Sequence, residues 1–239
     1  MNSVSIILLF YNHWDMTHAR MLELYKFAPE FCEICLLNNA SEEDCDSGVA
    51  WWQKTIAKHK LRYRKVEKNL GFGGGMNEGA KIATGDILVF LSNDVVVSGD
   101  FVTDIVTKIE NNNGKVFIGG EIVWHPAGWN EFNVEGKKVV VPWANGWLLA
   151  CTRDAWNEIG GFDPRYGKAD YEDVDISLTA QSLGYNLVAL NSPFTRHIGA
   201  ATIGYDEKRM EHTKHNREIF EQKWLSQLKE LHDKLTKTY

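Results

Sequence analysis

The chain has 239 residues, 44% of them hydrophobic, which is enough for one well-buried α/β domain with a small terminal appendage but not for two full domains. Its formal net charge of −6 disfavours a dedicated nucleic-acid-binding protein, because an acidic protein has no general attraction to a phosphate backbone. The same negative charge favours a bound metal ion if the substrate is a diphosphate.

The N-terminal apolar run at residues 4–10 is too short to span a membrane and lacks the basic start and small-residue cleavage site of a signal peptide. The four cysteines include one CxxC pair without a second pair to complete a zinc site, so we interpret them as free thiols in a reducing compartment. We therefore expect a cytoplasmic protein without a membrane span.

Alternating apolar and helical patterns predict a β-α-β-α-β arrangement at the start of the chain. Strands are expected at residues 4–10, 34–37 and 61–66, with helices at about 15–27 and after the acidic run at 42–46. This alternation is typical of a doubly wound, mostly parallel sheet flanked by helices.

The glycine-rich stretch at residues 69–79 matches neither common phosphate-binding motif. Met76 stands where the dinucleotide fingerprint requires its third glycine, and no lysine follows the glycines before Lys81. We interpret the stretch as a flexible turn entering a helix that ends near Gly85, where Asn77 and exposed N–H groups can meet an anionic or hydroxylated ligand. A plain tight turn is the alternative.

The apolar run at residues 87–91 ends abruptly in Ser92-Asn93-Asp94. A buried strand that ends in a carboxylate places this charge at the carboxyl edge of a sheet, where open α/β folds bind ligands. We therefore predict that Asp94 holds a divalent metal ion under the diphosphate of a sugar nucleotide.

Further along the chain, the pattern predicts a helix at about 99–111, a strand at 117–123, a hairpin or loop at 124–141 and a strand at 187–190. The acid-rich segment Tyr171-Glu172-Asp173-Val174-Asp175 begins a helix, and it holds more acids than the helix dipole requires. His197 lies in the predicted loop at 193–197.

The C-terminal region is polar, but one apolar stripe runs along its predicted helix. The stripe consists of Phe220, Trp224, Leu228, Leu231 and Leu235. We expect a domain at residues 1–205 and a C-terminal amphipathic extension at 206–239 that packs on this domain. A homodimer formed through this helix is the alternative.

Eight short motifs in a fixed order resemble the inverting family 2 glycosyltransferases of the GT-A fold, and within them the rhamnosyltransferase-like branch acting on bacterial cell-surface polysaccharides. The motifs are Tyr11-Asn12, Asn38-Asn39-Ala40-Ser41, Asn69-Leu70-Gly71-Phe72-Gly73, Thr84-Gly85-Asp86-Ile87, Ser92-Asn93-Asp94, Gly160-Gly161-Phe162-Asp163, Tyr171-Glu172-Asp173-Val174-Asp175 and His197-Ile198-Gly199. The resemblance implies a GT-A type α/β fold. It also implies transfer of a sugar from a UDP- or dTDP-sugar to a hydroxyl of a glycan, lipid-linked glycan or other acceptor.

The resemblance also implies roles for single residues. Asp94 matches the last acid of a DxD metal motif, in which Ser92 replaces the first acid, and His197 matches the histidine that completes the site. Carboxylate, imidazole and diphosphate oxygens suit Mn²⁺, and Mg²⁺ is the alternative. Asp173 matches the general base, with Glu172 beside it in the same motif.

The resemblance places the nucleoside at Tyr11, Asn12, Asn38 and Asp86, and further donor and acceptor residues come from the other patterns described above. We assign the nucleotide sugar to Tyr11, Asn12, Asn38, Asn69, Gly73, Asn77, Asp86 and Asn93. The family usually has aspartate at the position of Asn38, and an amide still accepts a hydrogen bond from uracil or thymine, although less strongly. Trp143, Asn145 and Trp147 are expected to bind the acceptor, since aromatic faces stack on sugar rings.

These roles fit the chemistry of glycosyl transfer, which needs a stabilised diphosphate leaving group and an activated acceptor hydroxyl. One base and no covalent intermediate invert the anomeric centre, and we expect the helix N-terminus to keep Asp173 ionised.

Two other functions compete with this interpretation. A nucleotidyltransferase is disfavoured because no Gly-rich segment with Arg and Lys follows the first strand. A nucleotide-sugar or glycan binding module that has lost catalysis is the non-enzymatic alternative. Ser92 and Asn38 favour it, whereas Asp173 and His197 oppose it.

Overall fold

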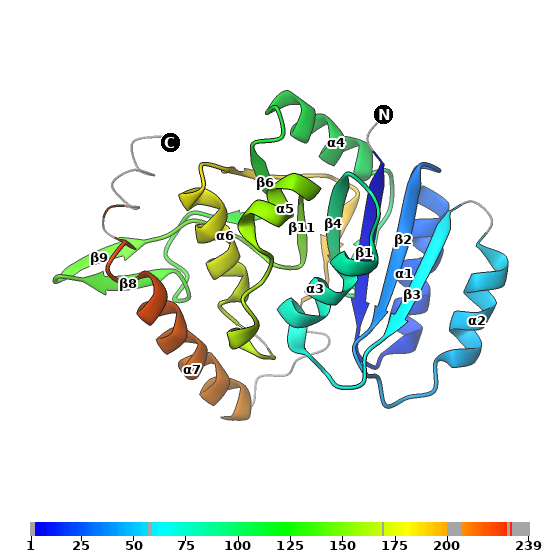
Figure 1. Cartoon of the computed structure of the whole chain (residues 1–239), viewed down its shortest axis with the longest axis horizontal. Helices are drawn as coiled ribbons and strands as arrows, with labels where there is room; N and C mark the ends of the chain where they lie inside the picture. The colour runs from blue at the N-terminus through cyan, green and yellow to red at the C-terminus, as the bar shows by residue number, and fades with distance from the viewer. Residues whose placement is uncertain (1–2, 57–58, 169, 200–206, 229, 231–239) are drawn as a thin grey trace.

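The computed structural model describes residues 3–56, 59–168, 170–199, 207–228 and 230. Within them, a central sheet has seven strands in the order β12-β6-β11-β4-β1-β2-β3 (Figure 1). The parallel strands are β1 (Val4–Phe10), β2 (Cys32–Asn38), β3 (Lys60–Lys65), β4 (Ile87–Ser92), β6 (Val116–Gly119) and β12 (Asn186–Ala189), while β11 (Leu148–Thr152) is antiparallel to both of its neighbours. The predicted doubly wound, mostly parallel sheet is confirmed.

Helices cover both faces of this sheet. One face packs against α1 (Trp14–Phe27), α2 (Asp46–Thr55) and α4 (Val102–Asn111), and the other against α3 (Gly71–Ile82), α5 (Arg153–Ile159) and α6 (Glu172–Ser182) (Figure 1). Side chains of β1 alternate between the two cores, so Ile6 and Leu8 enter the first and Ile7 enters the second. A strand buried on both faces can carry polar ligand-binding groups only at its ends.

The chain reverses direction across the sheet at β1. After β2 and β3 on one side, it returns to β4 on the other side, and Leu9 of β1 lies opposite Ser92 of β4. The carboxyl ends of β1 and β4 therefore flank the point at which the winding changes direction, which is where open α/β sheets bind ligands.

The glycine-rich stretch is a helix and not the flexible turn that the sequence suggested. Helix α3 begins at Gly71, and its glycines allow it to lie directly on the sheet and on neighbouring loops. A Cβ at Gly75 would lie 2.6 Å from Leu9, and one at Gly79 would lie 2.4 Å from Ile7. Close packing here outweighs the low helix propensity of glycine.

Three small pairs of strands extend the fold. The pairs are β5 (Val95–Val97) with β13 (Thr195–His197), β7 (Ile122–Val123) with β10 (Trp143–Ala144), and the hairpin of β8 (Glu131–Val134) with β9 (Lys137–Val140). The hairpin confirms one of the two predictions for residues 124–141. Strand β13 corrects the predicted loop at 193–197, because its pairing with β5 is a long-range contact that local sequence does not reveal.

Helix α7 (Glu207–Trp224) packs on its own chain, beside the hairpin and the short helix η1 (Pro164–Tyr166). Phe220, Trp224 and Leu228 are buried against Tyr166 and Tyr171. The remaining stripe residues, Leu231 and Leu235, lie outside the described residues, and the dimer stays an untested alternative. No helix in the described part of the chain combines the length and apolar character that a bilayer span requires.

The close contact between α3 and β1 gives a stability prediction. We expect Gly79→Ala to lower the free energy of unfolding by roughly 1–3 kcal/mol, because the new Cβ overlaps Ile7. Helix propensity alone predicts the opposite, since alanine is favoured over glycine by about 1 kcal/mol in a helix. Urea denaturation measures the difference, with Lys81→Ala on the exposed side of α3 as a control expected to change stability by less than about 0.5 kcal/mol. An unchanged or higher midpoint for Gly79→Ala contradicts this packing.

Candidate active site

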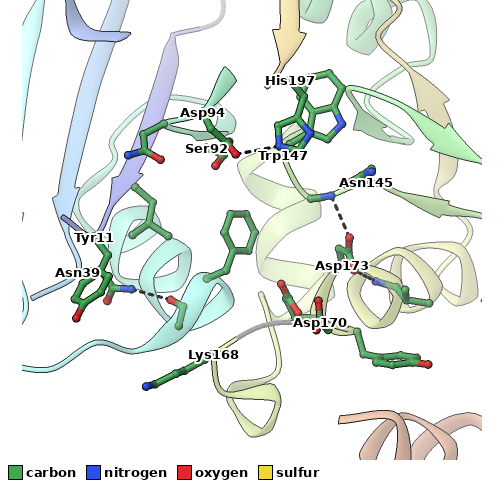
Figure 2. Close-up of a pocket in the computed structure, with 18 of the residues that line it drawn as sticks. Tyr11, Asn39, Ser92, Asp94, Asn145, Trp147, Lys168, Asp170, Asp173 and His197 are labelled. Atoms are coloured by element: carbon green, nitrogen blue, oxygen red, sulfur yellow. Dashed lines mark hydrogen bonds and ion pairs between the residues drawn. The ribbon is translucent and has the colours of Figure 1, made fainter. Parts of the chain in front are cut away.

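A cavity of about 520 Å³ opens at the carboxyl edge of the sheet, above the ends of β1 and β4 (Figure 2). Its walls come from these strand ends, the segment 143–147, the loop before α6, β13 and the start of α7. The cavity brings together the sequence-predicted residues Tyr11, Asn69, Asn93, Asp94, Trp143, Asn145, Trp147, Glu172, Asp173 and His197. Residues from distant parts of the sequence therefore share one site.

Asp94 and His197 form a pair on one side of the cavity (Figure 2). The pairing of β13 with β5 places them together, and the Asp94 Oδ2 to His197 Nε2 distance is 3.2 Å. Trp147 stacks on the imidazole with ring centroids 5.5 Å apart and an angle of 11° between the planes. The imidazole is thus held by an aromatic ring on one face and by a carboxylate at its edge.

The second oxygen of this carboxylate suggests a ligand. Asp94 Oδ1 is buried and has no hydrogen-bond partner within the described residues. Burial raises the pKa of Asp94, but hydrogen bonds from His197 and Ser92 outweigh it and hold the pKa below its usual value. No group of three or more His, Cys, Asp or Glu side chains suited to a metal occurs in the described chain. Asp94 and His197 are therefore one carboxylate and one imidazole that lie side by side in the cavity.

Asp173 lies on another wall of the cavity, in the first turn of α6. Its Oδ2 accepts hydrogen bonds from the Trp143 indole N–H at 3.3 Å and the Gly146 N–H at 3.1 Å, and its Oδ1 accepts one from Val174 N–H at 2.9 Å. A further bond from Ala144 N–H to Ser177 Oγ, 3.0 Å long, joins β10 to α6. The carboxylate is therefore fixed by the segment that was predicted to bind the acceptor.

The ionisation of Asp173 differs from the sequence-based expectation. Burial raises its pKa, and the N–H groups of Gly146, Val174 and Trp143 only partly oppose this effect. The pKa of Glu172 is also raised, first by burial and then by the charge of Asp173. Its Oε2 has no hydrogen-bond partner among the described residues. The helix N-terminus thus does not determine the pKa, because loss of water around the carboxyls is the larger effect.

A strained backbone precedes these carboxyls. Asp170 and Tyr171 both have φ of 73°, a conformation that non-glycine residues rarely adopt. Helix α7 holds it in place: Asn216 Nδ2 donates to the carbonyl oxygens of Tyr166 at 2.6 Å and Asp170 at 2.9 Å, and Arg209 pairs with the Asp170 carboxylate at 2.9 Å. The C-terminal extension therefore takes part in shaping the cavity.

The structure corrects the assignment of Asp86 to the nucleoside. Asp86 precedes β4 and lies at the amino edge of the sheet, opposite the cavity. Its Oδ2 accepts bonds from the N–H and Oγ of Ser3 at 3.0 and 2.8 Å, while Gly85 N–H donates to Ser5 Oγ at 2.7 Å. Hydrogen bonds of the Thr84-Gly85-Asp86 motif thus connect the start of β4 to the start of β1.

Asn38, which was also assigned to the nucleotide sugar, does not face the cavity, because its side chain is fully buried at the end of β2. Its Nδ2 donates to Tyr63 Oη at 3.2 Å and its Oδ1 accepts from Ser41 N–H at 2.7 Å. The next residue, Asn39, lines the cavity instead and donates to Asn69 Oδ1 and to the Gly71 carbonyl, each at 3.0 Å. Of the two neighbouring asparagines, the structure places Asn39 in the cavity lining and buries Asn38 next to it.

Asn12, Gly73 and Asn77 lie outside the cavity lining as well. Asn12 Oδ1 accepts from Glu42 N–H, which ties two loops together. Asn77 makes two hydrogen bonds with the backbone of Phe162. Gly73 packs closely against the Phe162 side chain. These residues thus stabilise loops next to the cavity and do not line it.

Several cavity residues had no signal in the sequence. Lys168 and Asp170 line the end that lies below Asp173 in Figure 2, and Arg209 of α7 also lines the cavity. They sit in loops or on α7, where no periodic pattern marks them. Their shared location becomes visible only when α7 is docked.

With this geometry in place, comparison with known proteins decides the family. The sequence profile of Glycosyl transferase family 2 matches residues 5–158. The chain belongs to this family. Among curated relatives, it is 25% identical over 124 residues to a glucosyl-dolichyl phosphate glucuronosyltransferase of Haloferax volcanii, which covers 43% of this chain and 37% of the relative. The chain spans between 29% and 56% of the length of the curated relatives it matches.

Solved structures of glycosyltransferases share the fold. The mannosyltransferase PcManGT from Pyrobaculum calidifontis, in complex with GDP-Man and Mn²⁺, superposes with a TM-score of 0.62 at 18% identity, over 79% of this chain and 54% of that one. GalNAc-T7 with UDP, GalNAc and Mn²⁺ gives 0.66 at 17% identity, over 82% and 43%. The predicted GT-A type fold of this glycosyltransferase domain is confirmed, whereas the rhamnosyltransferase-like branch stays an expectation.

The hydrogen bonds to Asp173 lead to a prediction about its titration. We expect Trp143→Phe to raise the pKa of Asp173 further, because this variant keeps an aromatic ring but removes the N–H that stabilises the carboxylate. A hydrogen bond to a charged group contributes about 1.5 kcal/mol, so the midpoint should move up by about one pH unit. Carbon-13 NMR of the labelled carboxyl measures it, and Trp51→Phe on the exposed surface of α2 is the control. A midpoint equal to that of the parent would contradict the role of this bond.

Proposed function

We propose that this glycosyltransferase moves a sugar from a nucleotide-diphosphate donor to an acceptor hydroxyl with inversion at the anomeric carbon. The observation that carries the proposal is that the Asp94–His197 pair and Asp173 line different walls of one cavity at the carboxyl edge of the sheet (Figure 2). The first can hold a metal ion at the leaving group, and the second can take a proton from the acceptor.

On the donor side, the nucleoside would lie against Tyr11 and Asn39, which follow β1 and β2, and against Asn69 in the loop before α3. Asp94 Oδ1 would hold the metal, and His197 Nε2 would join it by giving up its 3.2 Å contact with Asp94 Oδ2, while the diphosphate would supply further oxygen ligands. This mixed set of oxygen and nitrogen ligands suits Mn²⁺ better than Mg²⁺. The ion would stabilise the negative charge that develops on the leaving UDP or dTDP.

On the acceptor side, the hydroxyl proton passes to the Asp173 carboxylate as the oxygen attacks C1 of the donor sugar. The bond from C1 to the diphosphate oxygen breaks in the same displacement, so the configuration inverts. A raised pKa makes Asp173 a stronger base than an ordinary aspartate, provided that the pH is high enough to ionise it. Trp143, Asn145 and Trp147 would position the acceptor, which we propose is a glycan or lipid-linked glycan.

The base assignment is tested by Asp173→Asn. We expect a loss of transfer of about 10³-fold or more with nucleotide binding unchanged, because the amide keeps the shape but cannot accept the proton. Release of UDP or dTDP from a panel of nucleotide sugars measures turnover, and titration calorimetry measures binding. Asp154→Asn, an exposed acid in the first turn of α5, is the matched control and should retain full activity. Equal losses of turnover and nucleotide binding in Asp173→Asn would remove Asp173 from this role.

The metal site is tested by thermal shift with UDP, dTDP, GDP and their sugars, with and without Mn²⁺. We expect stabilisation by one nucleotide series to depend on Mn²⁺ in the parent protein, since metal and diphosphate bind together. Asp94→Ala and His197→Ala should each remove most of the Mn²⁺-dependent part, and Asp104→Ala on α4 should not. Transfer that proceeds at full rate in EDTA would overturn the site.

A further inference from the structure

A second cavity, of about 500 Å³, lies between the loop at 127–129 and helix α7. It shares Trp129, Tyr171 and Arg209 with the first cavity. Because the same three side chains line both spaces, the second cavity adjoins the first, so an acceptor longer than one sugar can contact both. The volume falls within the range of small-molecule binding sites.

Three basic side chains contribute to the lining of the second cavity. Arg209, Lys214 and Arg217 contribute to it, and no Asp or Glu is among its described lining residues. The Arg209 guanidinium pairs with Asp170, and that of Arg217 pairs with Glu221 and donates to the Glu131 carbonyl at 2.9 Å. Lys214 is exposed and forms no ion pair with the described residues. Its ammonium group is thus available to an anionic ligand.

The aromatic wall of the second cavity is preorganised. Trp129 packs edge-on against Tyr171 with ring centroids 5.9 Å apart, and Arg217 donates to Tyr171 Oη at 3.3 Å and to the Gly128 carbonyl at 3.4 Å. These contacts hold the half-buried indole at the junction of the two cavities. A fixed aromatic face next to a polar rim is suited to the apolar face of a sugar ring.

We propose that the second cavity binds an acidic sugar unit of the acceptor, so that the acceptor is an anionic glycan of at least two units. The unit that receives the sugar lies beside Asp173, and its neighbour stacks on Trp129 with a carboxylate or phosphate group at Lys214. This inference rests on the proposed function and adds to it the chemical class of the acceptor.

The experiment measures how much of the full chain binds to an array of immobilised sugars. The array carries monosaccharides, neutral oligosaccharides, uronic-acid oligosaccharides and phosphate-bearing oligosaccharides. We expect the strongest signals from acidic oligosaccharides, and the two acidic sets show whether the anion is a carboxylate or a phosphate. Lys214→Gln should weaken these signals about fivefold, the upper range for an exposed ion pair, and should leave neutral glycans unaffected. Lys54→Gln, an exposed lysine on α2, is the matched control.

Trp129→Ala is a second variant that tests the aromatic wall, and it should weaken binding of oligosaccharides about fivefold or more, a larger loss than for monosaccharides. The inference is overturned if neutral and acidic glycans bind equally, if Lys214→Gln changes nothing, or if no glycan binds. Metal-dependent release of UDP or dTDP from a nucleotide sugar is measured in parallel. If this release is present and depends on Asp94, failure of the array pattern rejects only the acidic acceptor, whereas its absence rejects the proposed function.

Discussion

Parallel pairing of β1 with β2 on one side and with β4 on the other is the constraint on which the site depends. Because β1 is buried on both faces, its polar neighbours can gather only beyond its ends. The carboxyl ends lead to Tyr11 and to Asp94, while the amino ends lead to Ser3 and Asp86, which bond to each other. The same pairing that builds the core therefore separates a ligand-binding edge from a structural edge.

The second half of the site depends on docking of α7 onto α6. Asp175, two residues after Asp173, is buried and accepts hydrogen bonds from the Trp224 indole at 2.7 Å and from Lys223 Nζ at 2.9 Å. The third acid of the motif therefore anchors the C-terminal helix, and that helix in turn holds the strained backbone at Asp170. A segment that the sequence suggested was an appendage therefore supports the loop that directly precedes the proposed base.

The parts of the fold that could be predicted are the helices and strands that the local spacing of apolar residues indicates. Apolar runs gave the strands, and the end of one run at Asp94 gave the edge that carries the site. Features set by contacts between distant segments were not predictable in this way. The sequence placed Gly71 in a turn, because only the approach of α3 to β1 shows why a glycine-rich helix is favoured. Asp86 was misplaced for a related reason, since an acid next to a strand does not reveal whether it lies at a ligand-binding edge.

The surroundings of Asp94 and Asp173 shift the pKa values of these two carboxyls in opposite directions, and this difference supports separate roles for them. Hydrogen bonds from His197 and Ser92 lower the pKa of Asp94 despite its burial, so it remains charged over a wide pH range, as a metal ligand must. Burial raises the pKa of Asp173, which brings its affinity for a proton closer to what a general base needs near neutral pH. Pairs of titratable groups whose surroundings separate their pKa values commonly divide charge stabilisation from proton transfer. In the reaction proposed for this protein, Asp94 stays ionised throughout, and Asp173 changes its protonation state as the new glycosidic bond forms.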